Sequence, residues 1–291
     1  MPMTAQPMPP QDADTPRTAR RRFLVVRNAR AGLAISHLTT EVERRLRAAG
    51  ADVAHLDTTD IDAARNISAI AARYDAIVAA GGDGTIRALA VATAGCDVPL
   101  GIIPAGTGNV MANEIGVPAS SGAIARMLID GPVREIEGAL ANGAPFYLMA
   151  GAGFAGAIVA ALDVAQKQRH GKLAYLGPVL KALGRRPVPF RVLVDGTAHE
   201  ATWVVATNAR HYAGRIVIAP RASLLTAGLH AVLLDSTSRL ALVQAMGLIA
   251  LGQHGAVKGL KIVPASRIEV PDPQPLEVDG DALGTAPLVV T

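Results

Sequence analysis

The sequence predicts an α/β domain with a parallel sheet, followed by a second domain that is a mostly antiparallel β-sandwich. Through residue 132, short apolar runs alternate with helical patterns, and this order builds a parallel sheet with helices on both faces. From residue 133 onward, helical patterns become rare and strand-like runs follow one another, which favours antiparallel pairing. With 291 residues and 50% hydrophobic content, the chain has enough apolar material for both cores.

The first residues have a different composition from the rest. Residues 1–15 are rich in Pro, Gln and Asp and have no apolar segment, so we expect a disordered stretch that is neither a secretory signal nor a membrane span. Four arginines then precede the first strand, at positions Arg17, Arg20, Arg21 and Arg22. Such a cluster is either a solvated flank or a contact for anionic lipid headgroups.

The first domain begins with alternating strands and helices. We expect a strand at 23–26 with a loop at 27–32, a helix that Ser36 caps and Gly50 closes, a strand at 51–56, and a helix that opens at Asp60 and runs to residue 72. The apolar run 76–78 is the next strand. Each loop that follows a strand should lie at the carboxyl edge of the sheet, where open α/β folds bind ligands.

A glycine-rich loop follows the strand at 76–78, with the sequence Gly81-Gly82-Asp83-Gly84-Thr85. Glycines allow a sharp turn and a close approach to a ligand, and a helix from Thr85 onward would direct free N–H groups at a phosphate. A carboxylate beside phosphates repels them unless a cation lies between, so Asp83 suggests bound Mg²⁺. The plain alternative is a glycine-rich turn in which Asp83 is present for turn propensity.

A second loop of the same kind follows the apolar run 100–103. It reads Pro104-Ala105-Gly106-Thr107-Gly108-Asn109 and leads into a helical pattern from Val110, with another helix expected over 121–129. Thr107 offers a hydroxyl to a phosphate, and Asn109 can cap the following helix. Two successive strand, loop and helix units therefore predict two phosphate-facing loops at one sheet edge.

The second half contains strand candidates at 133–137, 146–149, 190–194 and 203–207. Glycines at 151–156 precede an apolar stretch that indicates a helix over the cleft, and residues 173–183 form another apolar stretch. The stretch 240–251 is apolar on nearly every face. It is too short to span a bilayer, where about 20 residues are needed, so we expect either a buried helix or one that dips into a lipid surface.

Near the C-terminus, Asp279 and Asp281 flank Gly280. A turn at Gly280 would direct both carboxylates at the cleft, whereas the plain alternative is an ordinary Asp-Gly hairpin turn.

These motifs together resemble a known family. GGDGT at 81–85, followed by Pro-x-Gly-Thr-x-Asn at 104–109, is similar to the catalytic domain of the diacylglycerol kinase and sphingosine kinase superfamily, especially its soluble bacterial lipid kinases. GGDGT is also shared with NAD kinases, but the pair of motifs is more specific. Asn28 and Gly32 match part of the family's Asn-Pro-x-Ser/Ala-Gly loop, and residues 208–214 resemble its Asn-x-x-x-Tyr-x-Gly segment. The resemblance covers residues 23–291 and is densest in the first domain.

The resemblance implies a kinase that uses ATP and Mg²⁺ to phosphorylate a lipid hydroxyl, of a diacylglycerol-like or sphingoid-like molecule, between the two domains. Asp279 matches the aspartate proposed as the base in the family, Asp281 stands where a glutamate is usual, and Asp83 would hold the metal. The residues expected at the nucleotide are Asn28, Gly81, Gly82, Gly84, Thr85, Gly106, Thr107 and Asn109. We accordingly expect a disordered basic tail at 1–22, a nucleotide-binding α/β domain at 23–132, a β-rich lipid-substrate domain at 133–275, and a segment at 276–291 that returns to the interdomain cleft.

Three positions depart from the family pattern by losing a carboxylate: Val110, Ala155 and Ala227. Val110 weakens the expected network around Mg²⁺, and Ala227 puts in doubt an ancillary structural metal site. One alternative is therefore a degenerate member that binds nucleotide or lipid without turnover. Another is an NAD kinase that uses Asn113 and Glu114 as its ribose-binding pair.

Composition limits the partners. Aromatic residues make up 3% of the chain and no zinc-finger spacing occurs, so we expect no nucleic-acid partner. A single cysteine, Cys96, fits a reducing cytoplasm. The net charge of +4 and the pI of about 9.5 allow transient contact with an anionic membrane, peripherally at the inner face. The oligomeric state stays open, with a homodimer as one option.

Overall fold

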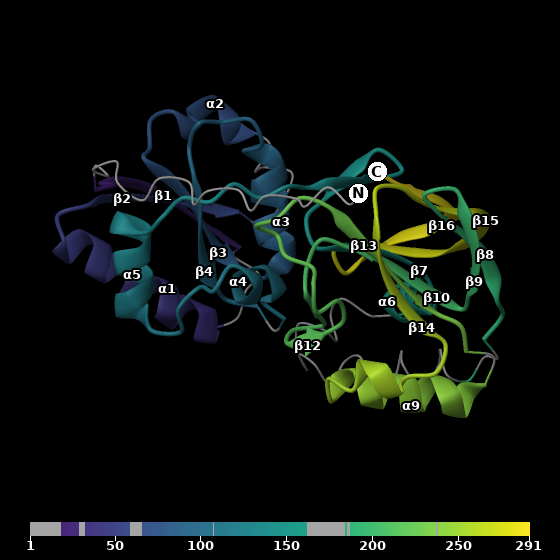
Figure 1. Ribbon diagram of the computed structural model, residues 1–291. Coiled ribbons are helices and arrows are strands. Elements are labelled where there is room, and N and C mark those ends of the chain that lie inside the picture. Colours follow the sequence, from purple (N-terminus) through teal and green to yellow (C-terminus); the bar gives the residue numbers. More distant parts are fainter. Residues whose placement is uncertain are drawn as a thin grey trace, which may run out of the picture.

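The computed structural model describes residues 19–28, 33–58, 66–106, 108–161, 184, 187–236 and 238–291. Two domains lie side by side, with the α/β domain on the left of Figure 1 and the strand-rich domain on the right. The predicted fold class is confirmed, because a parallel sheet precedes a larger antiparallel one. Within the described residues, no helix is long and apolar enough to cross a bilayer.

The α/β domain contains a four-stranded parallel sheet in the order β2-β1-β3-β4. Its elements are β1 (Arg22–Asn28), α1 (Leu33–Ala48), β2 (Asp52–Thr58), α2 (Ser68–Ala71), β3 (Ala76–Gly81), α3 (Asp83–Ala92), β4 (Leu100–Pro104), α4 (Val110–Glu114) and α5 (Ser121–Asp130). The strand order reverses between β1 and β3, and ligands bind at such a switch point in open α/β sheets.

Alternate residues of these strands face opposite sides of the sheet. One side, with Phe23, Val25 and Val78, packs against α1 and α5. The other side, with Leu24 and Ile77, packs against α2, α3 and α4. Both faces are therefore buried, which explains why the strands read as continuous apolar runs.

The second domain is built on a ten-stranded antiparallel sheet. Its elements are β5 (Ala139–Ala141), β6 (Ala144–Phe146), β7 (Met149–Gly153), α6 (Phe154–Ala160), β8 (Phe190–Val194), β9 (Thr197–Ala201), β10 (Trp203–Thr207), β11 (His211–Tyr212), β12 (Ile216–Val217), β13 (Leu229–Leu234), α9 (Arg239–Ala250), the 3-10 helix η3 (His254–Ala256), β14 (Leu260–Ala265), β15 (Ile268–Val278) and β16 (Asp281–Val290). The path is β14-β13-β10-β7-β15-β16-β5-β6, with β8 and β9 joined to β15. The small hairpin β11–β12 is separate.

The long strand β15 makes the sheet fold over on itself. It pairs with β8 at Ile268 and with β7 at Leu276, and its register against β16 shifts between Val270 and Gln274. An apolar cluster with members from β7, β8, β10, β13, β15 and β16 fills the space between the resulting layers. The expected boundary between residues 275 and 276 falls inside this strand.

Several expected elements differ from the observed ones. Residues 133–137 are not a strand, because this alternating run is mostly exposed and pairs with no neighbour. Helix α3 begins at Asp83 rather than at Thr85, and α1 begins at Leu33, before Ser36. The expected strand at 146–149 is divided between β6 and β7. The predictions for residues 1–18 and 173–183, and the predicted start of the helix at Asp60, lie outside the described residues.

The described arginines of the N-terminal cluster bind the protein itself. The Arg20 guanidinium donates to the carbonyls of Leu128 (2.6 Å) and Gly131 (2.7 Å) at the end of α5. Arg22 forms an ion pair with Asp75 at 2.8 Å. Arg21 donates to the carbonyl of Ala49 after α1. These arginines therefore hold helix ends and a strand end in place.

Candidate functional site

The two glycine-rich loops lie against each other at the carboxyl ends of β3 and β4, which are neighbouring strands. The Ala105 N–H donates to the Gly81 carbonyl at 2.9 Å. A Cβ placed on Gly106 would lie 2.5 Å from the Cα of Gly82. No side chain fits between the loops, so glycine at these two positions is required by loop-to-loop packing.

Each loop is also braced internally. Asn109 has a left-handed backbone (φ 49°), and its side chain both accepts from the Gly106 N–H and donates to the Gly106 carbonyl, each at 2.8 Å. In the first loop, a Cβ on Gly81 would lie 2.6 Å from Thr85, whose side chain is buried. Gly84 has open space where its Cβ would be. Of the glycines in the first loop, Gly84 thus leaves room for a ligand.

Asp83 connects the two loops. It is the first residue of α3, and its Oδ1 accepts from the backbone N–H of Met111 in α4 at 3.1 Å. A Cβ on Gly108 would lie 2.8 Å from Asp83 Oδ2, so the second loop passes directly over this carboxylate. Asp83 is thereby positioned at the junction of both predicted phosphate loops.

Two further residues were expected at the nucleotide, Thr107 and Asn28. Thr107 lies outside the described residues. Asn28 is the last residue of β1, in register with Thr58 of β2. Because β1 neighbours β3, its end lies at the same edge of the sheet as Gly81.

The acidic C-terminal motif forms a hairpin turn between β15 and β16. Asp279 (φ 50°) and Gly280 (φ 83°) both have positive φ, which is typical of a tight two-residue hairpin turn. The Asp279 side chain is 1% exposed, and its oxygens accept from the N–H groups of Leu148 (2.9 Å), Met149 (2.9 Å) and Tyr147 (3.1 Å). Asp281, in contrast, has a 65% exposed side chain. The two carboxylates therefore differ sharply in environment.

Arg87 joins this hairpin to the first loop's helix. Its Nε lies 3.5 Å from Asp279 Oδ2, and its Nη1 lies 3.1 Å from Asp281 Oδ2. Arg87 is one helical turn after Asp83, on the same side of α3. Sequence reasoning missed Arg87. The signal available was its four-residue spacing from Asp83, but its partner Asp281 lies 194 residues away in the chain.

Burial raises the pKa of the Asp279 carboxyl above its ordinary value. The three backbone N–H donors and the Arg87 guanidinium act in the opposite direction, because they favour the charged form, but burial is the larger effect. Two residues earlier, Glu277 is also buried. Its carboxylate accepts a hydrogen bond from the hydroxyl of Tyr212 in β11 at 3.0 Å. The end of β15 thus carries two buried carboxylates.

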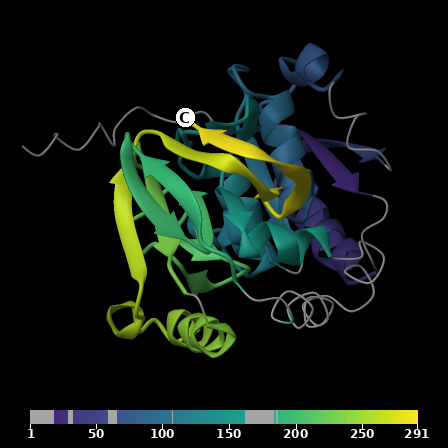
Figure 2. The same cartoon turned by 90° about the vertical axis from the view of Figure 1, so that its right-hand side faces the viewer.

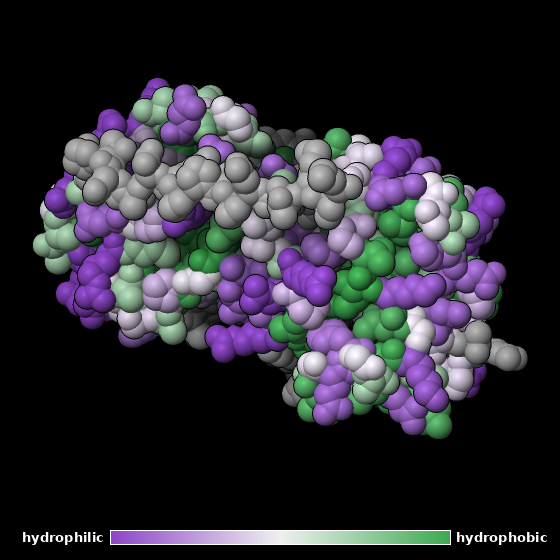
Figure 3. All heavy atoms as spheres, viewed as in Figure 1, coloured by the Kyte–Doolittle hydropathy of each residue, from purple (hydrophilic) through white to green (hydrophobic). Residues whose placement is uncertain are grey.

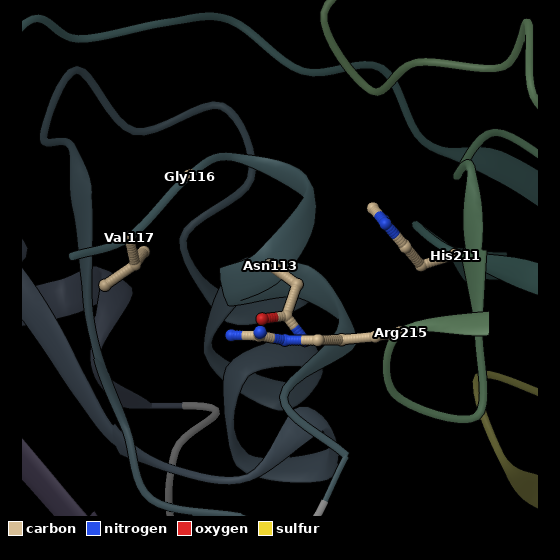
Figure 4. Close-up of a pocket in the computed structure, with 5 residues that line it drawn as sticks. All are labelled: Asn113, Gly116, Val117, His211 and Arg215. Carbon is tan, nitrogen blue, oxygen red and sulfur yellow. The ribbon is translucent and has the colours of Figure 1, made fainter. Parts of the chain in front are cut away.

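A pocket of about 340 Å³ lies between α4 and the β11–β12 hairpin (Figure 4). In the close-up, Asn113 extends from α4, and His211 and Arg215 both extend from the β11–β12 side, with the Arg215 side chain reaching Asn113. Asn113 donates to the carbonyls of Gly108 (3.4 Å) and Gly214 (3.3 Å), and Glu114 lies 2.6 Å from His211 Nδ1. Both residues of the expected NAD kinase ribose pair are therefore engaged in contacts with protein groups. The remaining lining residues are Gly116 and Val117.

The positions that lack a family carboxylate are placed as follows. Val110 is buried as the first residue of α4, and Ala227 is exposed in a bend before Gly228. Ala155 is the second residue of α6. Across the described ranges, no group of three or more His, Cys, Asp or Glu side chains is arranged to hold a metal ion.

The glycines at 151–156 serve packing. Residues 149–153 form β7, and the helix starts only at Phe154. A Cβ on Gly156 would lie 2.0 Å from the carbonyl oxygen of Pro275 in β15. Helix–sheet contact therefore explains the glycine at position 156.

The fold and the site define a class of two-domain proteins in which paired glycine-rich loops of an α/β domain meet an acidic hairpin of a β-sandwich domain. Residues 22–141 match the family model described as the diacylglycerol kinase catalytic domain, and residues 149–291 match the YegS C-terminal NAD kinase beta sandwich-like domain. The chain belongs to the diacylglycerol kinase family of lipid kinases.

Individual relatives agree with this assignment. A protein of Mycobacterium tuberculosis named diacylglycerol kinase is 34% identical over 243 residues, which cover 79% of this chain and 78% of the relative. A diacylglycerol kinase of Bacillus subtilis is 27% identical over 278 residues, with 92% of each chain covered. A crystal structure of a diacylglycerol kinase from Bacillus anthracis superposes with a TM-score of 0.73 at 24% identity and 94% coverage of each chain, so the fold is shared.

Proposed function

We propose that this lipid kinase transfers the γ-phosphate of ATP, with Mg²⁺, to the hydroxyl of a diacylglycerol-like or sphingoid-like lipid. One observation carries the proposal. Arg87, one helical turn after Asp83 in α3, pairs with both Asp279 and Asp281, so the acidic hairpin lies against the helix that follows the first glycine-rich loop. Relatives that match most of the chain are named diacylglycerol kinase, which supports a lipid as the acceptor.

The phosphate side of the reaction falls to the loops and α3. The N-terminal N–H groups of this ten-residue helix and the open side of Gly84 favour an anionic ligand. Asp83 would hold Mg²⁺ directly or through water, and a single carboxylate fits a cation that takes its other ligands from phosphates. Mg²⁺ held there would supply positive charge against the phosphates.

We assign the two hairpin carboxylates different roles. A base must reach the substrate hydroxyl, and the exposed Asp281 carboxylate meets this requirement. Asp279 is buried and bonded to three backbone N–H groups, which suits a residue that holds the hairpin in place. This assignment differs from the family-based expectation that Asp279 is the base.

The alternatives are weaker. An NAD kinase would need Asn113 and Glu114 for a ribose, yet Glu114 is bonded to His211 and Asn113 to backbone carbonyls. A degenerate member that only binds ligands is favoured by Val110, Ala155 and Ala227. Neither reading explains why Arg87 links the hairpin carboxylates to the helix of the first loop.

The test is phosphate transfer from radiolabelled ATP to a panel of monoacyl, diacyl, sphingoid and polyprenyl alcohols in detergent micelles with Mg²⁺. We expect label in one lipid class, and a loss of about a hundredfold or more in kcat for Asp83→Asn and for Asp281→Asn. Asp272→Asn, an exposed carboxylate of the same strand β15, should retain wild-type activity.

Three outcomes would overturn the proposal. ATP binding without product from any lipid would favour the degenerate reading, and NADP⁺ formation from NAD⁺ would favour an NAD kinase. If Asp281→Asn kept full activity while a folded Asp279→Asn variant lost it, Asp279 rather than Asp281 would be the base.

A further inference from the structure

Helix α9 presents an apolar face to the outside of the molecule. Its inner side, with Leu242, Ala245 and Ile249, is buried in an apolar cluster to which both domains contribute. The outer side carries Leu240, which is 67% exposed, and Val243, which is 46% exposed. Leu251 directly after the helix is 74% exposed. A surface helix ordinarily places polar or charged side chains outward, so this face needs a partner.

The outward positions repeat at intervals of three and four residues, as required for one helical face. They are occupied by Leu240, Val243, Gln244, Gly247 and Leu251, so Gln244 is the sole polar side chain among these five described positions. In Figure 3, the lower rim of the second domain, where Figure 1 places α9, carries apolar side chains interspersed with hydrophilic ones.

The sequence around α9 is strongly basic. Residues 201–268 contain seven Lys or Arg and one acidic residue, Asp235, so this segment carries a charge of +6 although the whole chain carries +4. All seven cations are exposed, and they are Arg210, Arg215, Arg221, Arg239, Lys258, Lys261 and Arg267. Arg267 has a partner in Glu269 at 2.9 Å. Arg239 begins α9, and Lys258 follows η3, which packs on α9.

The helix lies near the domain junction. It packs on β12, and the β11–β12 hairpin contacts α4 through His211 and Gly214. Helix α4 directly follows the second glycine-rich loop. In Figure 1, α9 runs along the lower edge of the molecule, where its lower side meets no other labelled element. Figure 2 shows the same yellow-green helix at the lower edge after the turn of 90°.

We propose that the outer face of α9 and its flanking cations form the surface through which the protein contacts an anionic lipid bilayer. Leu240, Val243 and Leu251 enter the boundary between headgroups and acyl chains, and Arg239, Lys258 and Lys261 bind lipid phosphates. This inference rests on the proposed function, because a kinase with a lipid substrate has to bind the membrane in which that substrate lies.

Charge favours an anionic bilayer over a second copy of this chain as the partner of α9. A second copy docked symmetrically on α9 would bring two segments of +6 together, which repel each other. The N-terminal arginines are a poorer contact, because Arg20 and Arg22 are bonded to helix-end carbonyls and to Asp75.

The experiment measures cosedimentation of the full chain with sucrose-loaded vesicles of phosphatidylcholine containing about a third phosphatidylglycerol. We expect binding that weakens with salt and that falls about tenfold or more in Leu240→Asp/Leu251→Asp. The matched control Val133→Asp/Val188→Asp changes two exposed apolar residues outside the basic segment and should bind within about twofold of wild type.

A second pair of variants tests the charges. Lys258→Glu/Lys261→Glu should lower binding about tenfold at low salt, whereas Arg73→Glu/Arg126→Glu, with the same change in net charge on the first domain, should not. Circular dichroism and light scattering accompany each variant.

The inference is overturned if the wild-type protein does not bind anionic vesicles, or if the Leu240→Asp/Leu251→Asp variant binds them as well as wild type. It is also overturned if wild type is a dimer and this variant is a monomer. Kinase activity on lipid in detergent micelles is independent of vesicle binding. Its absence in wild type would count against the proposed function, while its retention in the α9 variant would not.

Discussion

Asp279 shows how one residue combines a backbone requirement with a charge requirement. Its left-handed φ of 50° is tolerated by Asp and Asn better than by most residues, which explains an Asp in the turn. Its burial then requires hydrogen bonds, and three N–H groups of the 147–149 segment supply them. The carboxylate is thus part of the hairpin's structure whatever its role in the reaction.

The raised pKa of Asp279 makes a prediction about stability. Because its folded-state pKa lies above the unfolded value near 3.8, its contribution to stability is present in full below that value and is lost as the pH rises through the folded pKa. Asp279→Asn cannot ionise. The free energy of unfolding of this variant, measured by urea titration and compared with wild type, should therefore improve relative to wild type as the pH rises above 4. Asp272→Asn should show no such trend, and a difference for Asp279→Asn that stays flat with pH would contradict the assignment.

At the scale of elements, the two glycine-rich loops and α3 act as one unit. Gly82 and Gly106 let the loops touch, Asn109 closes the second loop, and Asp83 binds the start of α4. Loop-to-loop packing and ligand approach are thus assigned to different glycines.

Matched alanine variants separate these two uses of glycine. Gly106→Ala places a Cβ 2.5 Å from the Gly82 backbone and should cost about 1–3 kcal/mol of unfolding free energy. Gly84→Ala meets nothing within 4 Å in the first turn of α3 and should leave stability equal or higher, by up to about 1 kcal/mol. If a phosphate approaches Gly84, this second variant should nonetheless bind ATP more weakly, as isothermal titration would show. Equal stability of the two variants would refute the packing assignment.

The sequence revealed those features of the site that are local. Glycines after an apolar run identified both loops, and Asp-Gly near the C-terminus identified the hairpin, because a short segment determines each. The prediction of a strand at 133–137 was wrong. Alternating apolar and polar residues form a strand only where another strand pairs with them, and these residues have no such partner. Arg87 was missed because its partners are set by how the two domains pack, which no local pattern reports.

At the scale of the whole molecule, the domains share both apolar and polar contacts. One apolar cluster includes Leu89 of α3, Met111 of α4 and Trp203 of β10. The Tyr147 hydroxyl donates to the Ala90 carbonyl at 3.1 Å, which adds a second contact along α3. Protein contacts along α3 therefore hold the glycine-rich loops and the acidic hairpin together, and Arg87 pairs with the hairpin carboxylates at this junction.

Arg87→Gln tests whether this junction matters for catalysis as well as for stability. Removing the guanidinium leaves Asp279 buried without its cation, so we expect a loss of about 2 kcal/mol in unfolding free energy. The hairpin carboxylates should also lose their position relative to the loops, which lowers kcat about tenfold or more while the KM for ATP changes little.

Arg87→Lys should restore only part of the lost stability and of the lost kcat, because an ammonium cannot bind two carboxylates as a guanidinium does. As a control, Arg44→Gln breaks an exposed pair with Glu41 and should leave the free energy of unfolding close to that of wild type, because exposed ion pairs contribute little. Urea denaturation and steady-state kinetics on the four proteins decide the matter, and a wild-type kcat in Arg87→Gln would show that the bridge serves stability alone.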